Sequence, residues 1–163
     1  MARATLVKKA RKDYPQAGIK KGESYWWWQF AFSARSLSKT EPTRSQLTQS
    51  SFLSQLYALE DGIDWDVFET FAGLQDERDT LIAEIDNLRD EAQDSLDNMP
   101  EHLQDTSSSG ELLTERIEML EQWRDELENV DCEFDDGDMD KDEAVEKLDE
   151  LKDELNGISY EGS

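Results

Sequence analysis

From Leu74 to Leu103, apolar residues recur mostly in steps of three and four, and most residues between them are polar or charged. This spacing places the apolar side chains on one helix face and predicts a coiled coil, with a stutter between Ala92 and Leu96. Pro100 has no backbone N–H to donate, so a break in the helix is expected there. The apolar stripe comprises Leu74, Leu81, Ile85, Leu88, Ala92, Leu96, Met99 and Leu103.

Two further helices are predicted after this one. Residues 110–130 carry an apolar stripe from Leu113 to Val130, and residues 139–156 carry another that starts at Val145 and precedes a C-cap at Gly157. The loop at residues 105–110 is short, and short loops join antiparallel neighbours. Residues 63–163 are therefore expected to form an acidic antiparallel coiled-coil hairpin or a three-helix bundle.

Residues 1–62 have a different pattern. Residues 23–32 are aromatic, lack helical spacing and predict a strand. A helix is expected over residues 45–59, with Thr43 and Gln46 at capping-box spacing, and it is expected to cover one face of the strand. The predicted fold class is thus α+β, mostly α, with a small strand-and-helix module at residues 1–62 and a helical domain at residues 63–163.

The charge of the chain divides near the same boundary. The net charge is −23, yet residues 1–59 hold ten Lys/Arg and three Asp/Glu, a net +7. Residues 60–163 hold seven basic and 37 acidic residues, a net −30. Such asymmetry indicates two parts with different partners.

Several kinds of site are excluded by composition. The single cysteine, Cys132, leaves no partner for an internal disulfide and no Cys-rich zinc site, and the single histidine, His102, leaves little for a catalytic triad. No P-loop, GxSxG, GxGxxG or HExxH sequence is present. We therefore expect no enzymatic activity, no metal and no cofactor. Neither a signal peptide nor an apolar run of about 18 residues is seen, so no membrane contact is expected.

The segment from Cys132 to Glu143 has some features of an EF-hand loop. With Gly137 at the sixth position, Glu143 is the twelfth, but Cys132 and Phe134 fall at the first and third and cannot supply carboxylates. The alternative is an acidic loop between two helices, and no metal site is predicted there.

The basic, aromatic N-terminal part is one candidate for partner binding. Lysines beside a Trp-rich strand are typical of a platform that stacks bases above a phosphate-binding groove. Strand alternation puts Trp26, Trp28, Phe30 and Phe32 on one face, which is expected to form the core, and leaves Tyr25 and Trp27 on the other for a partner. The candidate residues are Lys8, Lys9, Arg11, Lys12, Lys20, Lys21, Tyr25 and Trp27.

The acidic helices are the second candidate. Residues 76–105 hold eleven acids, about one per 4 Å at the helical rise of roughly 1.5 Å per residue. Two or three such helices side by side approach the density of about one charge per 1.7 Å in B-DNA, which suggests an imitation of nucleic acid. The alternative is that the acids only keep a coiled coil soluble. The candidate residues are Asp76, Glu77, Asp79, Glu84, Asp86, Asp90, Glu91 and Asp94.

Two stretches carry a resemblance to a known family: GIKKGESYWWWQF with SKTEPTRSQLTQSSFLSQLYALED, and later DNMPEHLQDTSSSGELLTERIEMLEQW. Over most of its length the chain resembles an uncharacterised family of small bacteriophage and prophage proteins. Some relatives have cysteines around the strand, as in a zinc ribbon, whereas this chain has none there. The resemblance implies a phage context and assigns no activity. The lack of an internal disulfide fits a reducing, cytosolic setting, so a location in the host cytoplasm is expected.

Three functional hypotheses follow. The first is a non-enzymatic phage-type accessory or inhibitor protein whose acidic helices bind a partner protein, itself a nucleic-acid-binding protein, in the manner of a DNA mimic that blocks host defence. The second is a nucleic-acid-binding protein that uses residues 1–62, with the acidic part competing for them. The third is a structural phage component that assembles as a homo-oligomer through the coiled coil.

Overall fold

The computed structural model describes residues 1–134 and 139–161, and its chain divides into two compact units, Met1–Ala58 and Leu59–Ser163. The sequence predicts the boundary a few residues later, after residue 62. Helix α1, Ser51–Gly62, begins in the first unit and ends in the second. A three-stranded sheet precedes a series of helices, so the predicted α+β, mostly α class is confirmed.

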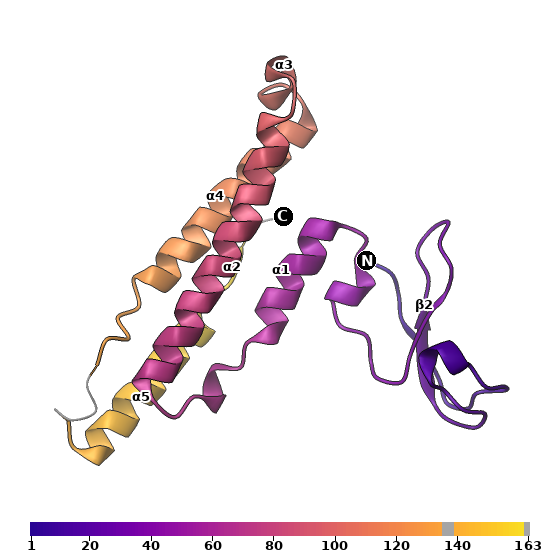
Figure 1. Cartoon of the computed structure of the whole chain (residues 1–163), viewed down its shortest axis with the longest axis horizontal. Coiled ribbons are helices and arrows are strands. Elements are labelled where there is room, and N and C mark those ends of the chain that lie inside the picture. The colour runs from indigo at the N-terminus through magenta and orange to yellow at the C-terminus, as the bar shows by residue number, and fades with distance from the viewer. Residues whose placement is uncertain (135–138, 162–163) are drawn as a thin grey trace. The chain divides into compact units, whose positions relative to one another are not determined.

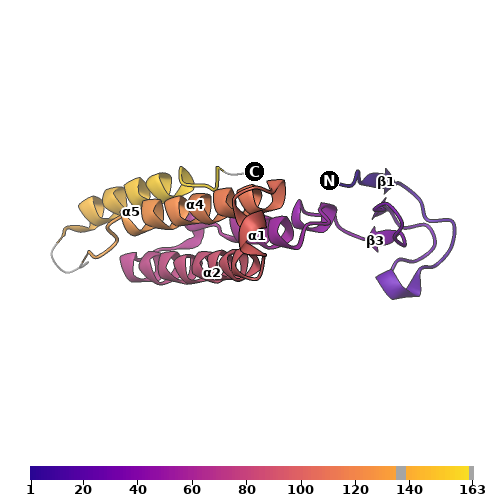
Figure 2. The same cartoon turned by 90° about the horizontal axis from the view of Figure 1, so that it is seen from above.

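The sheet of the first unit is antiparallel, in the order β1-β2-β3. Its strands are Thr5–Val7, Tyr25–Trp28 and Ser36–Ser38, and Trp27 of the central strand pairs with Thr5 on one side and Leu37 on the other. Figure 2 labels β1 and β3, the two outer strands of this sheet. The central strand is shorter than predicted because residues after Trp28 turn back toward β3.

Both faces of the central strand carry a buried residue, whereas the sequence predicts burial of one face. Tyr25 forms a buried cluster with Ala10 and Ile19, and Trp27 packs against it. Residues 8–24 fold back over this face, since Ala10 N donates to Glu23 O at 2.8 Å and Gly22 N donates to Ala10 O at 2.9 Å. The expectation that Tyr25 and Trp27 lie on a free face is therefore wrong. Trp28, on the opposite face, is buried as predicted.

The predicted helix at residues 45–59 is interrupted. A 3₁₀ turn, η2, spans Ser45–Leu47, and Thr48 is extended before α1 begins at Ser51. The predicted capping box is confirmed, because Thr43 N donates to Gln46 Oε1 at 3.2 Å and Gln46 N donates to Thr43 Oγ1 at 3.4 Å. It caps the 3₁₀ turn rather than the α-helix. The buried cluster of the sheet is formed by residues 7–37 and includes no residue of α1.

The second unit is helical, as predicted. After a 3₁₀ turn, η3 (Trp65–Val67), come α2 (Phe71–Asp97), α3 (Glu101–Gln104), α4 (Ser108–Glu128) and α5 (Lys141–Asn156). Figure 1 shows α2 and α4 side by side, joined at one end by α3. This pair is the predicted antiparallel hairpin, and α5 packs against η3 at its other end.

Each long helix of this unit begins at a polar side chain that accepts backbone N–H groups. Thr70 caps α2 by accepting from Gly73 N, and Ser107 caps α4 by accepting from Gly110 N. Asp140 caps α5 by accepting from two N–H groups, those of residues 142 and 143. Such caps satisfy N–H groups that have no partner within the helix. Pro100 precedes α3, where the predicted break occurs.

The core of the second unit follows the predicted stripes with two departures. Leu74, Leu81, Ile85, Leu88 and Ala92 are buried, but the stripe fades toward α3, where Leu103 is 38% exposed. On α5, Val145 was expected inside and is instead 60% exposed, because it lies at the flank of the face that buries Leu148, Leu151 and Leu155. Aromatic rings join the elements: Phe71 lies 5.3 Å from Phe134, and Trp123 lies 6.3 Å from Tyr160.

Candidate partner-binding surfaces

The eight acids predicted on α2 lie away from its buried stripe. Glu77 and Asp86 are half-buried, and the other six are exposed: Asp76, Asp79, Glu84, Asp90, Glu91 and Asp94. The helical repeat explains this placement, because residues three and four apart share a face and the leucines already occupy the opposite one. The structure therefore brings the predicted acids together on the solvent side of one helix.

Three of these acids are paired with arginines of the same unit. Arg89 contacts Asp86 at 3.0 Å and Asp90 at 2.7 Å, and Arg78 contacts Asp79 at 2.7 Å. The hydrogen bonds that the Arg89 guanidinium donates to the Asp90 carboxylate raise the pKa of Arg89. Among the described residues, Asp76, Glu84 and Asp94 take part in no ion pair. Their carboxylates are exposed and carry charge that the chain does not neutralise.

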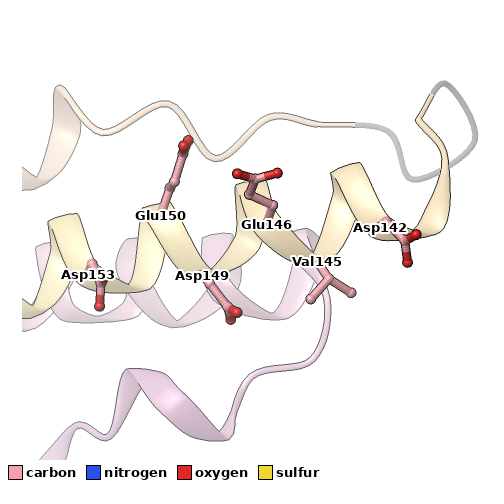
Figure 3. A pocket seen from close by; sticks show the side chains of 6 residues that line it. All are labelled: Asp142, Val145, Glu146, Asp149, Glu150 and Asp153. Atoms are coloured by element: carbon pink, nitrogen blue, oxygen red, sulfur yellow. The ribbon is translucent and has the colours of Figure 1, made fainter.

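A second acidic face lies on α5, and it is not among the residues predicted from the sequence. Figure 3 shows its side chains, which line an open depression of about 510 Å³. The residues are Asp142, Val145, Glu146, Asp149, Glu150 and Asp153. Two of the carboxylates have a lysine partner, since Lys152 lies 3.6 Å from Asp149 and Lys147 lies 3.1 Å from Glu150. The recurrence of acids in steps of three and four is the sequence signal that identifies this face.

The six predicted lysines and arginines of the first unit lie on one excursion of the chain. All are exposed, and all belong to the segment between β1 and β2: Lys8, Lys9, Arg11, Lys12, Lys20 and Lys21. Because Val7 pairs with Tyr25, this segment leaves and rejoins the sheet at the same end. The six basic side chains thus belong to one continuous exposed excursion that starts and ends at the same end of the sheet.

The aromatic residues proposed to work with these lysines are not free for stacking. Tyr25 is buried, and its ring lies 5.4 Å from that of Tyr14. Trp27 is half-buried, and the Arg35 guanidinium lies 4.6 Å from its ring centre. The aromatic side chain that is fully exposed is Phe32, which the strand pattern had placed on the core face. No feature of the sequence distinguishes it from its neighbours.

Two acids accept backbone hydrogen bonds within this basic part, Asp13 from Lys21 N at 2.6 Å and Glu23 from Lys20 N. Glu23 also contacts a lysine side chain. Its carboxylate accepts from Lys20 N at 2.8 Å and lies 3.5 Å from Lys39 Nζ. The backbone hydrogen bond from Lys20 lowers the pKa of Glu23. A carboxylate with a lowered folded pKa stabilises the folded form above its unfolded pKa, and this contribution is lost as pH falls through the folded value.

Gly137, the sixth position of the EF-hand alignment over residues 132–143, lies outside the described residues, and so does Asp136, which that alignment puts at the fifth. Within the described part, Cys132 is buried and Phe134 packs on Phe71, so the first and third positions belong to the core of the unit. Burial raises the pKa of the Cys132 thiol. The ninth position, Asp140, holds the first turn of α5.

Across residues 1–134 and 139–161, no group of three or more His, Cys, Asp or Glu side chains has an arrangement that could hold a metal ion. None of the helices in this described part combines the length and the apolar character needed to cross a membrane.

Comparison of the chain with protein-family models, with curated proteins and with solved structures finds no match in any of the three.

Proposed function

We propose that this chain is a non-enzymatic, phage-type accessory or inhibitor protein of the host cytoplasm that binds a basic surface of a partner protein through α2. The observation that carries the proposal is the set of exposed carboxylates on α2 that have no counter-charge among the described residues, above all Asp76, Glu84 and Asp94. Surface charges of one sign attract and orient a partner of the opposite sign.

The charge density favours a partner that normally binds nucleic acid. Residues 60–163 hold 37 acids against seven basic residues, and α2 and α4 run side by side. Solubility alone needs a net charge of only about 2–8 for a small domain. The acids of residues 76–105, about one per 4 Å along the helix, present a partner with a row of like charges, as the phosphates of a nucleic acid do.

The test is a charge reversal with a matched control. The variant Asp76→Lys, Glu84→Lys, Asp94→Lys is compared with Glu115→Lys, Glu118→Lys, Glu121→Lys, which makes the same change in net charge on exposed positions of α4. Tagged protein is used to capture partners from nuclease-treated bacterial lysate, and affinity for the captured partner is then measured. The α2 variant is expected to bind the captured partner at least about tenfold more weakly, because lysines that repel a basic surface replace acids that attract it. This loss corresponds to about 1.4 kcal/mol of binding free energy.

Two results would contradict the proposal. Unchanged affinity of the α2 variant would show that α2 is not part of the interface. An equal loss in the two variants would show that net charge matters and that this helix has no special role. Circular dichroism of each variant checks that its helices remain folded.

Nucleic-acid binding by the first unit is the second candidate function, and a specific observation favours it. Six exposed lysines and arginines lie on one excursion at one end of the sheet. Neutralising Lys8, Lys9, Lys20 and Lys21 to Gln in the full chain is expected to weaken binding to single-stranded DNA. The slope of log affinity against log salt should become shallower by about 0.7 for each phosphate that the variant no longer neutralises. Binding that does not respond to salt would rule this candidate out.

A further inference from the structure

An apolar pocket opens at the N-terminal end of α5. Its volume is about 360 Å³, and its lining includes Phe71, Ala144, Val145 and Leu148. Phe71 and Leu148 are buried in the core of the unit, 2% and 8% exposed, while Val145 is 60% exposed. Glu69, Asp140 and Lys141 also contribute to the lining. The pocket thus has an apolar interior, with two carboxylates and one ammonium group among the residues that line it.

The pocket continues directly into the acidic face of α5. Val145 lines both the pocket and the acidic depression. In Figure 3, Val145 and Asp149 project from the same side of the helix, with Asp153 one turn further on. At a rise of about 1.5 Å per residue, these two carboxylates begin about 6 Å and about 12 Å along the helix from Val145. Along α5, the apolar pocket is therefore followed by acids at one-turn intervals.

We propose that this pocket receives an apolar side chain from a basic helical segment of the partner, whose lysines or arginines one and two turns further on meet the acids of α5. The inference rests on the proposed function in taking the partner to be basic, and it adds that the partner is amphipathic. Charge complementarity selects this occupant, because every side chain of the α5 face other than Val145 is an acid. Lys147 and Lys152 pair with two of these five acids, so the face keeps a net negative charge that a basic segment complements and an acidic segment does not.

The apolar anchor and the charges have separate roles in this arrangement. Surface ion pairs contribute little affinity, since both charges stay hydrated. An apolar side chain that leaves water for a pocket contributes more and fixes the register of the segment. The pocket accounts for selection among basic partners, which an acidic face alone does not provide.

Synthetic peptides test this directly on the full-length protein. One helical peptide carries Leu with Lys at the fourth and eighth positions after it, and a second has Ser in place of the Leu with all charges kept. The Leu peptide is expected to bind at least about tenfold more tightly, as a buried leucine side chain predicts. It is also expected to shift the NMR amide signals of Phe71, Val145 and Leu148, whereas the Ser peptide leaves them in place.

Val145→Ser supplies the matched protein variant, because the position is exposed and the change keeps the net charge. It is expected to reduce the preference for Leu over Ser, while Asp76→Lys, Glu84→Lys, Asp94→Lys leaves the preference unchanged. Equal binding of the two peptides, or signal changes confined to α2, would overturn the pocket inference and leave the proposed function standing. Failure of the α2 reversal to affect the lysate partner would overturn the proposed function without touching the peptide preference.

Discussion

Among the described residues, Phe32 is the one residue other than glycine that has a positive φ. Its side chain is fully exposed, 110% of the reference area, and its φ is +61°. The turn around it is held by Ser33, whose Oγ accepts from Phe30 N at 3.2 Å and whose backbone N donates to Phe30 O at 3.2 Å. A left-handed φ brings Cβ close to the backbone and costs roughly 1–2 kcal/mol in residues other than glycine.

Substitutions at Phe32 are therefore expected to change the free energy of unfolding in the order glycine variant, parent, valine variant, from highest to lowest. Phe32→Gly removes the Cβ contact and should raise the free energy of unfolding by about 0.5 kcal/mol, the gain being reduced by the greater freedom of glycine in the unfolded chain. Phe32→Val, with a β-branched side chain, should lower it. Urea unfolding of the two variants and the parent measures the order. The reverse order would show that the aromatic ring stabilises the turn.

Strand alternation separated the two faces of residues 25–28 correctly, but it did not predict that the face of Tyr25 is covered as well as that of Trp28. The cover over Tyr25 comes from Ala10 and Ile19, which are joined to the sheet by hydrogen bonds within the excursion of residues 8–24. Periodicity describes only neighbours along the chain, so a loop that folds back over a strand leaves no periodic signal. The exposure of the Phe32 side chain could not be predicted from the strand pattern for the same reason.

At the scale of elements, the junction of α3 and α4 depends on one glycine. Gly110 is buried in the first turn of α4, and a Cβ there would lie 2.0 Å from Gln104 O and 2.7 Å from Leu103 O. These are backbone atoms, so a side chain cannot be accommodated by a change of rotamer. The absence of a Cβ is what lets the chain reverse so tightly between the two long helices.

Gly110→Ala is expected to lower the free energy of unfolding of the second unit by at least about 2 kcal/mol, because the added methyl group forces the backbone apart. Gly62→Ala is the matched control: nothing lies within 4 Å of a Cβ there, and alanine favours a helix by up to about 1 kcal/mol. Denaturant unfolding, monitored by circular dichroism, measures the free energy of unfolding of both variants. A Gly110 variant as stable as the control would mean that the turn relaxes without cost.

The helices were the part most open to prediction from sequence, since each long helix has a cap and a 3-and-4 apolar stripe. Pro100 and the cap at Thr43 also had the predicted effects. Prediction failed where a residue lies at the edge of a stripe: Val145 fits the spacing, yet the width of the contact face decides its exposure. The pocket beside it is formed by residues from separate segments, and no linear pattern encodes it.

For the molecule as a whole, the distribution of charge sets the response to solvent. Residues 60–163 carry a net charge of −30, and the ion pairs of the described residues engage only part of the acids. Repulsion among like charges opposes the compact state, and salt screens it over a distance of about 10 Å at 0.1 M.

The thermal midpoint of the full chain is therefore expected to rise as sodium chloride is increased from low concentration to about 0.5 M, because the Debye length shortens and the repulsion declines. Differential scanning calorimetry at several salt concentrations measures it, with glucose of equal osmolarity as the control. A midpoint that falls with salt would mean that attraction between opposite charges, rather than repulsion, dominates the electrostatics of the folded chain.

Because Cys132 is buried, its rate of reaction with a thiol reagent reports local opening of the structure around it. The thiol is 1% exposed and lies two residues after Val130, whose carbonyl oxygen accepts from the Arg78 guanidinium of α2. A thiol reagent reaches such a group only when the surrounding structure opens. The rate of labelling thus measures the free energy of separating the end of α4 from α2, without any engineered probe. A cysteine introduced on the surface can be labelled first, with the native thiol left intact.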